Sequence, residues 1–215
     1  MIRRAVEALV VGAAGSAIAG TAAATVGVAS AGVVVGGCNG LISGWRRIYD
    51  WRCSTGLAAF VLDSSWALPS TAGAQVTHLI AAATGAHHVA DMSIRRNRHV
   101  YARGFTPRRG FAVTIGNTIS GAGDTATERR RHLVDHHEEV HVWQARLLGP
   151  IFPVAYLGWI GIAAPLGALA WLRGRRAGDQ STTLWSAVDR FAYWNNPFER
   201  QAYLRASQAT RAVPD

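Results

Sequence analysis

Lysine is absent from the chain, and acidic residues are scarce. All 22 basic residues are arginine, against 13 acidic residues, which gives a formal net charge of +9 over 215 residues. A balance this basic would permit nucleic-acid binding. The arginines, however, flank apolar segments instead of forming one patch, so we expect no nucleic acid among the partners.

Cysteine is almost absent as well. Cys38 and Cys53 are the only two in the sequence. They could form one disulfide, but neither has the spacing to a neighbouring cysteine that paired zinc ligands show. The two cysteines therefore indicate neither a redox compartment nor a cysteine-based metal site.

Charge is missing altogether from residues 8–45. About 20 apolar residues span a bilayer as a helix, so this run is long enough for one span with excess, or for a tight helical hairpin. Arginines at both ends allow a hairpin with both ends in the cytoplasm. We therefore expect residues 1–54 to form a retained segment in a bacterial cell membrane, with lipid as a partner.

Small residues recur at every fourth position within this run, a pattern typical of closely packed membrane helices. One row comprises Gly12, Ser16, Gly20 and Ala24, and the other Gly32, Gly36, Gly40 and Gly44. The second row resembles a glycine zipper and predicts a homo- or hetero-oligomer.

Within an expected interfacial helical region at residues 55–94, residues 55–85 are apolar with a break around residues 63–70, which predicts two short helical or interfacial pieces. Two strand-like runs follow, at residues 100–103 and 111–115, and predict a short β-hairpin. The expected fold class is α+β, mostly α.

The most informative stretch is residues 135–144, which contains His-Glu-x-x-His at His137, Glu138 and His141. On a helix, positions i and i+4 share one face, so the two imidazoles can hold one zinc ion. Glu138 would lie beside the metal, where a carboxylate can take a proton from water. A capping-box pattern at residues 125–128 and Gly149-Pro150 predict the ends of this helix.

A catalytic zinc site needs a third protein ligand and one open position. Glu199 is the best candidate. Asn196 and Pro197 predict a helix start, because asparagine caps helices and proline suits their first turn. Glu199 would project from that turn. The alternative is a glutamate that only favours the helix dipole.

The run from His137 to Gln144, followed by Glu199-x-x-Ala202, resembles the gluzincin-type zincin metallopeptidases. It is particularly similar to the small metallopeptidase-like domain of bacterial contractile injection system proteins. The resemblance implies a minimal zincin-like domain within residues 95–215, with a short β-hairpin, a metal helix and a later helix that bears the glutamate. It also implies Zn²⁺ as cofactor and a protein or peptide substrate.

In that scheme His137, His141 and Glu199 bind the metal, and Glu138 activates the attacking water. Gln144 would orient a ligand or the substrate, and Tyr193 or Tyr203 would stabilise the oxyanion. Tyr203 is a departure from the family pattern, since many gluzincins have an aspartate there that supports a ligand histidine.

Residues 151–172 carry no charge and are followed by arginines, so they are a candidate membrane span. A single crossing would put His141 and Glu199 on opposite sides of the bilayer. We therefore favour a membrane hairpin or re-entrant segment broken near residues 161–165, where Pro165 removes a helical hydrogen bond. The alternative is a full span with a different third ligand.

The sequence thus predicts a membrane-bound zinc hydrolase of the peptidase class. Two alternatives stay open. One is a non-catalytic structural or assembly membrane protein with a structural metal site. The other is a pore formed by the glycine-rich helices.

Overall fold

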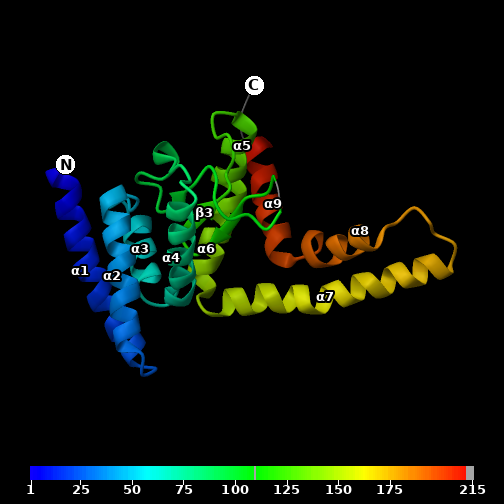
Figure 1. The fold of residues 1–215 in the computed structure, drawn as a ribbon, viewed down its shortest axis with the longest axis horizontal. Coiled ribbons are helices and arrows are strands. Elements are labelled where there is room, and N and C mark those ends of the chain that lie inside the picture. Colours follow the sequence, from blue (N-terminus) through cyan, green and yellow to red (C-terminus); the bar gives the residue numbers. More distant parts are fainter. Residues whose placement is uncertain (109, 212–215) are drawn as a thin grey trace. The chain divides into compact units, whose positions relative to one another are not determined.

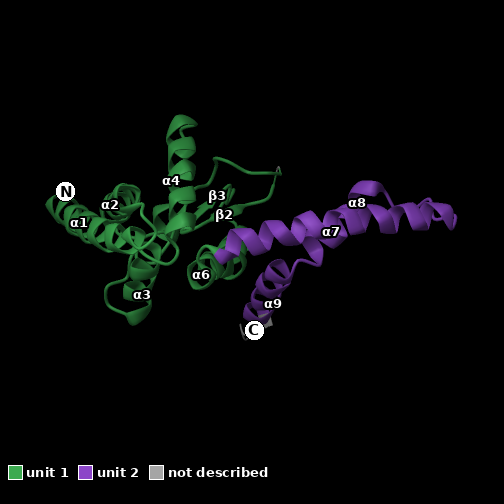
Figure 2. Cartoon of the chain, turned by 90° about the horizontal axis from the view of Figure 1, so that it is seen from below, with its two compact units in different colours: residues 1–150 green, residues 151–215 purple. Residues whose placement is uncertain are grey.

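The computed structural model describes residues 1–108 and 110–211 of the chain. It divides into two compact units, Met1–Pro150 and Ile151–Asp215 (Figure 2). Most of the described chain is helical, with one small three-stranded sheet in the first unit (Figure 1). This confirms the α+β, mostly α class. The unit boundary at Pro150 is not one that the sequence predicted.

The first unit begins with a helical hairpin. Helices α1 (Ile2–Ala24) and α2 (Ala29–Arg46) lie side by side and run in opposite directions (Figure 1). Gly27, with φ of +78°, lies in the turn between them. Of the two alternatives for this run, the structure has the hairpin.

The second row of small residues, on α2, packs against α1 inside this hairpin, mainly at Val11, Gly15 and Ala19, whereas Ala24 of the first row is exposed. A Cβ atom added to Gly36 would lie 2.3 Å from the carbonyl oxygen of Gly15. One added to Gly32 would lie 2.3 Å from the carbonyl oxygen of Ala19, and Gly40 is equally close to Val11. The glycine row of α2 is thus buried against α1 of the same chain. An oligomer through that row stays a prediction.

Replacing Gly36 by alanine should destabilise the hairpin. The new methyl group meets backbone atoms that cannot move aside. Overpacking of this kind costs about 1–3 kcal/mol, more than the gain of up to about 1 kcal/mol in helix propensity. Gly37→Ala is the matched control, because its methyl group would meet only the Ser16 side chain. Thermal unfolding of detergent-purified protein should show a lower Tm for Gly36→Ala alone, and equal values for both variants would contradict this packing.

The next two helices confirm the two pieces predicted for residues 55–94. They are α3 (Ser54–Asp63) and α4 (Leu68–Ala83), and a short 3-10 turn, η1 (Ala90–Met92), follows them. The stretch between α3 and α4 is the predicted break. Residues of α3, η1 and the sheet supply much of the buried apolar core of this unit.

The sheet corrects the predicted strand pairing. It contains β1 (His99–Val100), β2 (Val113–Ile115) and β3 (Thr118–Ser120), in the order β1-β3-β2. Strand β2 pairs with β3 in an antiparallel hairpin, whereas β1 runs parallel to β3. The predicted pairing of residues 100–103 with 111–115 is therefore wrong. The hairpin turn is Gly116-Asn117, where Gly116 has φ of +56°, a conformation that glycine adopts most easily.

The helix that carries His137 and His141 is a continuous run of three segments. They are α5 (Glu128–Leu133), the π-helical η2 (Val134–Glu138) and α6 (Glu139–Leu148). The helix starts at Glu128 with Thr127 as its cap residue, so the capping box predicted at residues 125–128 does not form. Instead the Asp124 carboxylate accepts a hydrogen bond from the Ala126 amide.

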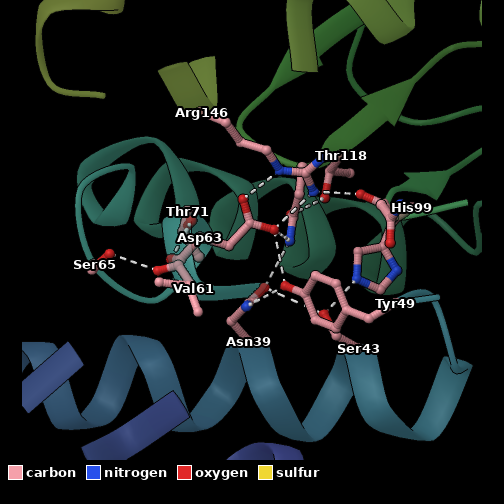
Figure 3. A network of polar contacts seen from close by, with 12 residues as sticks. Asn39, Ser43, Tyr49, Val61, Asp63, Ser65, Thr71, His99, Thr118 and Arg146 are labelled. Atoms are coloured by element: carbon pink, nitrogen blue, oxygen red, sulfur yellow. Dashed lines mark hydrogen bonds and ion pairs between the residues drawn. The ribbon is translucent and has the colours of Figure 1, made fainter. Parts of the chain in front are cut away.

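A buried polar network joins four parts of the first unit (Figure 3). Asp63 of α3 and Arg146 of α6 form a bidentate ion pair, with N–O distances of 2.8 and 2.9 Å, and both side chains are about 1% exposed. The hydroxyl of Tyr49 donates to Asp63, and the Asn39 amide of α2 donates to Tyr49. Asn117, in the β2–β3 turn, donates to Asp63 and Asn39. The network therefore links the hairpin to α6.

Three histidines form a second cluster beside this network, in which His78 and His99 are buried and His88 is half-buried. The His99 ring lies 4.5 Å from the ring centroid of His78 and 6.0 Å from that of His88. Burial, together with the charge of Arg46, lowers the pKa of His78 to about 3 and that of His88 to about 4. The pKa of His99 is also well below 6.5, first because of its burial. All three rings are neutral at neutral pH.

Acid should therefore destabilise this unit. Because the folded-state pKa values lie below the unfolded value of about 6.5, the unfolded chain binds more protons, and stability falls as the pH drops below about 6.5. Urea unfolding of metal-free protein at pH 7.5 and pH 5 measures this loss. His78→Gln should reduce the pH dependence, and the exposed His136→Gln should keep it. Equal pH dependence in all three proteins would contradict the assignment.

The second unit is a long helix and a returning arm. Helix α7 (Ile151–Arg176) runs without interruption through Pro165, so the break predicted near residues 161–165 is wrong. The chain turns back after it and returns as α8 (Leu184–Asp189) and the π-helical η3 (Arg190–Trp194), then continues as α9 (Pro197–Arg211). The returning arm packs along α7: the Trp159 and Trp171 indoles donate to the carbonyls of Phe191 and Thr182.

Two helices of the described chain are long and apolar enough to cross a membrane, α1 and α7. A buried core helix and an N-terminal signal sequence meet the same criterion. In α7 only 11% of the most apolar 18-residue window is buried. Its apolar side chains are therefore largely exposed.

Candidate metal centre

His137 and His141 are positioned by the junction between η2 and α6, one helical turn apart. Both are buried, and their Nε2 atoms lie 3.3 Å from each other. Two nitrogen ligands at 2.0–2.1 Å from a tetrahedral zinc ion are about 3.3–3.4 Å apart. The two imidazoles therefore face each other at the separation that one shared zinc ion requires. The π-helical segment η2, which contains His137 and Glu138, is a feature often found at functional sites.

Gln144, one further turn along α6, holds the second histidine in place. Its side-chain oxygen accepts a hydrogen bond of 2.8 Å from Nδ1 of His141. With the ring proton on Nδ1, the lone pair of Nε2 is available to a metal. Of the two roles predicted for Gln144, this contact corresponds to orienting a ligand.

Glu138 is buried next to His137, and strand β2 fixes its carboxylate. The Thr114 hydroxyl donates a hydrogen bond of 2.7 Å to Oε2 of Glu138. The sequence placed Thr114 in a strand before the metal helix but gave no sign of this contact, because strand and helix meet only in the folded unit.

Glu199 lies in the first turn of α9, as the sequence predicts. Helix α9 begins at Pro197, and the Asn196 side chain caps it by accepting a hydrogen bond of 3.0 Å from the Phe198 amide. The Tyr156 hydroxyl of α7 donates a hydrogen bond of 2.6 Å to Oε1 of Glu199. Sequence reasoning missed Tyr156, which belongs to the stretch interpreted as a membrane segment.

The returning arm explains how Glu199 comes to lie near the start of α7. Because α8 and η3 run back along α7, they bring α9 to the end of α7 at which Tyr156 lies. The hairpin expected inside residues 151–172 is therefore absent, and the chain reverses only after the end of α7 at Arg176. A helix as long as a membrane span is therefore compatible with a glutamate close to its first turns.

Tyr193 and Tyr203 contact each other in the second unit. Their hydroxyl oxygens are 3.0 Å apart, and the Tyr203 ring stacks on Trp194. Burial, with the hydrogen bond to Tyr203, raises the pKa of Tyr193. Tyr193 therefore keeps its proton at neutral pH and can act as a hydrogen-bond donor.

The three predicted ligands, His137, His141 and Glu199, form a group of buried side chains that could hold a metal ion. In the part of the chain that the structure describes, no other group of three histidine, cysteine or acidic residues has this arrangement.

Cys38 and Cys53 are exposed and form no disulfide. Comparisons of the chain with protein-family models, curated proteins and solved structures found no match.

Proposed function

We propose that the protein is a membrane-bound, zinc-dependent peptidase of the zincin-like type. The observation that carries this proposal is the 3.3 Å separation of the two Nε2 atoms of His137 and His141, with the Glu138 carboxylate on the same turn. Glu199 supplies the third ligand in this scheme. Two nitrogens and one carboxylate form the donor set of many catalytic zinc sites, which leaves one position open.

The protein side chains divide the chemical work. A bound zinc ion would polarise the substrate carbonyl and make water acidic enough to react at neutral pH. Glu138 takes the proton from the attacking water and delivers it to the leaving amine. Thr114 holds one oxygen of Glu138, so the other oxygen is the one that accepts the proton. Gln144 keeps Nε2 of His141 free of a proton. Tyr193, or Tyr203, donates to the oxyanion.

The apolar helices support the membrane part of the proposal. In α7 the exposed large side chains are aliphatic or aromatic, and arginines follow at its end. Arginines flank the α1–α2 hairpin as well, which favours a bacterial cell membrane with these ends in the cytoplasm. The substrate would then be a protein or peptide that reaches the membrane surface.

A structural metal site is the second candidate. The observation that favours it is burial: the three ligands and Glu138 are each at most 6% exposed. A closed site of this kind can hold a fold together without chemistry. The protein would then be a non-catalytic membrane protein whose metal stabilises its assembly.

Metal content tests the proposed site. Protein purified in detergent without added zinc should carry about one zinc ion per chain by elemental mass spectrometry. His137→Ala and Glu199→Ala should each lose it, because each removes one of three ligands. His136→Ala, the exposed neighbour of His137, is the control and should keep it. If Glu199→Ala retained zinc, Glu199 would not be the third ligand. If the wild-type protein carried no zinc, the proposed zinc-dependent function would be wrong.

A further inference from the structure

A small basic pocket lies at the open end of the α1–α2 hairpin. It has a volume of about 210 Å³ and is lined by Arg4, Trp45, Arg46, His88, Ala90 and Ile94. Arg4 belongs to the first turn of α1, and Arg46 is the last residue of α2. Since the helices run antiparallel, these two arginines come together at one end. A water molecule takes about 30 Å³ of liquid volume, so the pocket can hold a group of several atoms.

The charge of this pocket is not neutralised by the chain. Among the residues that the structure describes, Arg4 and Arg46 form no ion pair, and no carboxylate lines the pocket. The nearby Arg47 and Arg95 differ, because both pair with Glu7. Two uncompensated guanidinium groups on one pocket make a site for an anion.

Arg46 is held in place for this role. Its guanidinium donates a hydrogen bond of 2.5 Å to the Tyr101 hydroxyl and lies 5.1 Å from the centre of the Tyr101 ring. His78 in turn contacts the same hydroxyl at 2.9 Å. A guanidinium has five N–H donors, so donors beyond the one bound to Tyr101 are available to a ligand. Arginine is well suited to phosphate, whose oxygens it can bind in pairs.

The surroundings of the pocket point to an amphiphilic ligand. Trp45 and Ile94 on its wall are 49% and 37% exposed. The pocket lies at one end of the hairpin, and the outer faces of α1 and α2 run from that end. These faces expose the aliphatic side chains of Leu9, Val10, Val33, Val34 and Leu41. Tryptophan beside arginine is the pairing found at the headgroup level of membranes. An anionic head with acyl chains would match both the pocket and the faces beside it.

We propose that this pocket binds the phosphate group of an anionic phospholipid, with Arg4 and Arg46 on the phosphate and the acyl chains along the outer face of the hairpin. The shared chemistry is a phosphate ester, which a soluble compound could also present. The exposed aliphatic faces favour the lipid. This inference does not depend on the peptidase function.

Lipid binding to the full chain tests the site. Detergent-purified protein is titrated with phosphatidylglycerol, phosphatidylcholine or glycerol 3-phosphate, and bound molecules are counted by native mass spectrometry. We expect one tightly bound phosphatidylglycerol per chain and weaker binding of the other two. Arg4→Gln should weaken phosphatidylglycerol binding about tenfold or more, in line with the loss of a charge-assisted hydrogen bond. Arg3 is also exposed but lies outside the pocket, so Arg3→Gln should bind like wild type.

Three results would overturn the proposal. Equal losses in Arg3→Gln and Arg4→Gln would show attraction to general surface charge. Equal affinity for phosphatidylcholine would show that the pocket does not recognise the negative charge of the headgroup. Equal affinity for glycerol 3-phosphate would make this a site for soluble phosphate esters. Arg46→Gln provides a second variant. It also loses the contact with Tyr101, so its Tm is compared with that of wild type. If the Tm is unchanged, Arg46→Gln should also bind phosphatidylglycerol more weakly than wild type.

Discussion

Glu138→Gln should abolish peptide hydrolysis while leaving the metal in place. Glutamine has nearly the shape of glutamate and can keep an oxygen near the Thr114 hydroxyl, but its amide cannot accept the proton of the attacking water. Loss of a general base lowers the rate by about 10²–10⁴-fold. His137 and His141 are unchanged, so zinc content should stay at the wild-type level. Hydrolysis of fluorogenic peptides, measured beside zinc content, tests both expectations.

Glu139→Gln is the matched control for this experiment. Glu139 is the next residue along the same helix, but its carboxylate pairs with Arg98 at 2.7 Å. It should therefore hydrolyse peptides at close to the wild-type rate. If Glu138→Gln hydrolyses peptides as fast as wild type, Glu138 is not the base. If wild type is inactive on every peptide although zinc is bound, the structural metal site becomes the better explanation.

The parts of the candidate site that could be predicted from sequence depend on neighbouring residues. His137 and His141 lie one turn apart because helix geometry fixes that spacing. Asn196 and Pro197 define a helix start by local rules, and so they place Glu199 in a first turn. Thr114 and Tyr156 lie 24 and 43 residues from the carboxylates that they contact. Contacts of that range depend on tertiary structure, so neither residue had a local signal.

The same distinction explains the errors in the fold. Pro165 predicted a break because it removes one helical hydrogen bond, yet α7 continues through it. Apolar helices tolerate proline more readily than soluble ones, and here the returning arm packs along the same helix. In the sheet, residues 111–115 were expected to pair with residues 100–103, but Gly116 is in the turn of a hairpin that pairs β2 with β3. The local sequence is compatible with either pairing, and the choice between them depends on tertiary contacts.

Asp63 was interpreted as an interruption between two apolar helices, and it proves to be the centre of the buried network. Its carboxylate binds Arg146 and Tyr49 (Figure 3). It also accepts a hydrogen bond from Asn117. Burial by itself would lower the pKa of Arg146, but the charge and hydrogen bonds of Asp63, together with Tyr49 and Glu139, raise it. A single acidic residue in an apolar run thus indicates a buried partner as readily as a break.

Asp63→Ala should therefore be the most destabilising of the substitutions considered. It leaves the guanidinium of Arg146 buried, without its carboxylate partner. Removing one member of a buried ion pair costs about 3–5 kcal/mol. The free energy of unfolding, measured with urea in detergent, reports this loss. Asp91→Ala is the control, because the Asp91–Arg131 pair is 60% and 43% exposed and is worth about 0–1 kcal/mol.

The double variant Asp63→Leu with Arg146→Met separates the ion pair from the rest of the network. Replacing both charges by apolar side chains removes the desolvation cost, so much of the stability lost in Asp63→Ala should return. Losses as large as in Asp63→Ala would instead show that the hydrogen bonds from Tyr49 and Asn117 dominate. Because Arg146 lies on the helix that carries His141, Asp63→Ala should also lower zinc content, and the double variant should regain it. Unchanged zinc content in Asp63→Ala would show that the metal helix is held independently of the α1–α2 hairpin.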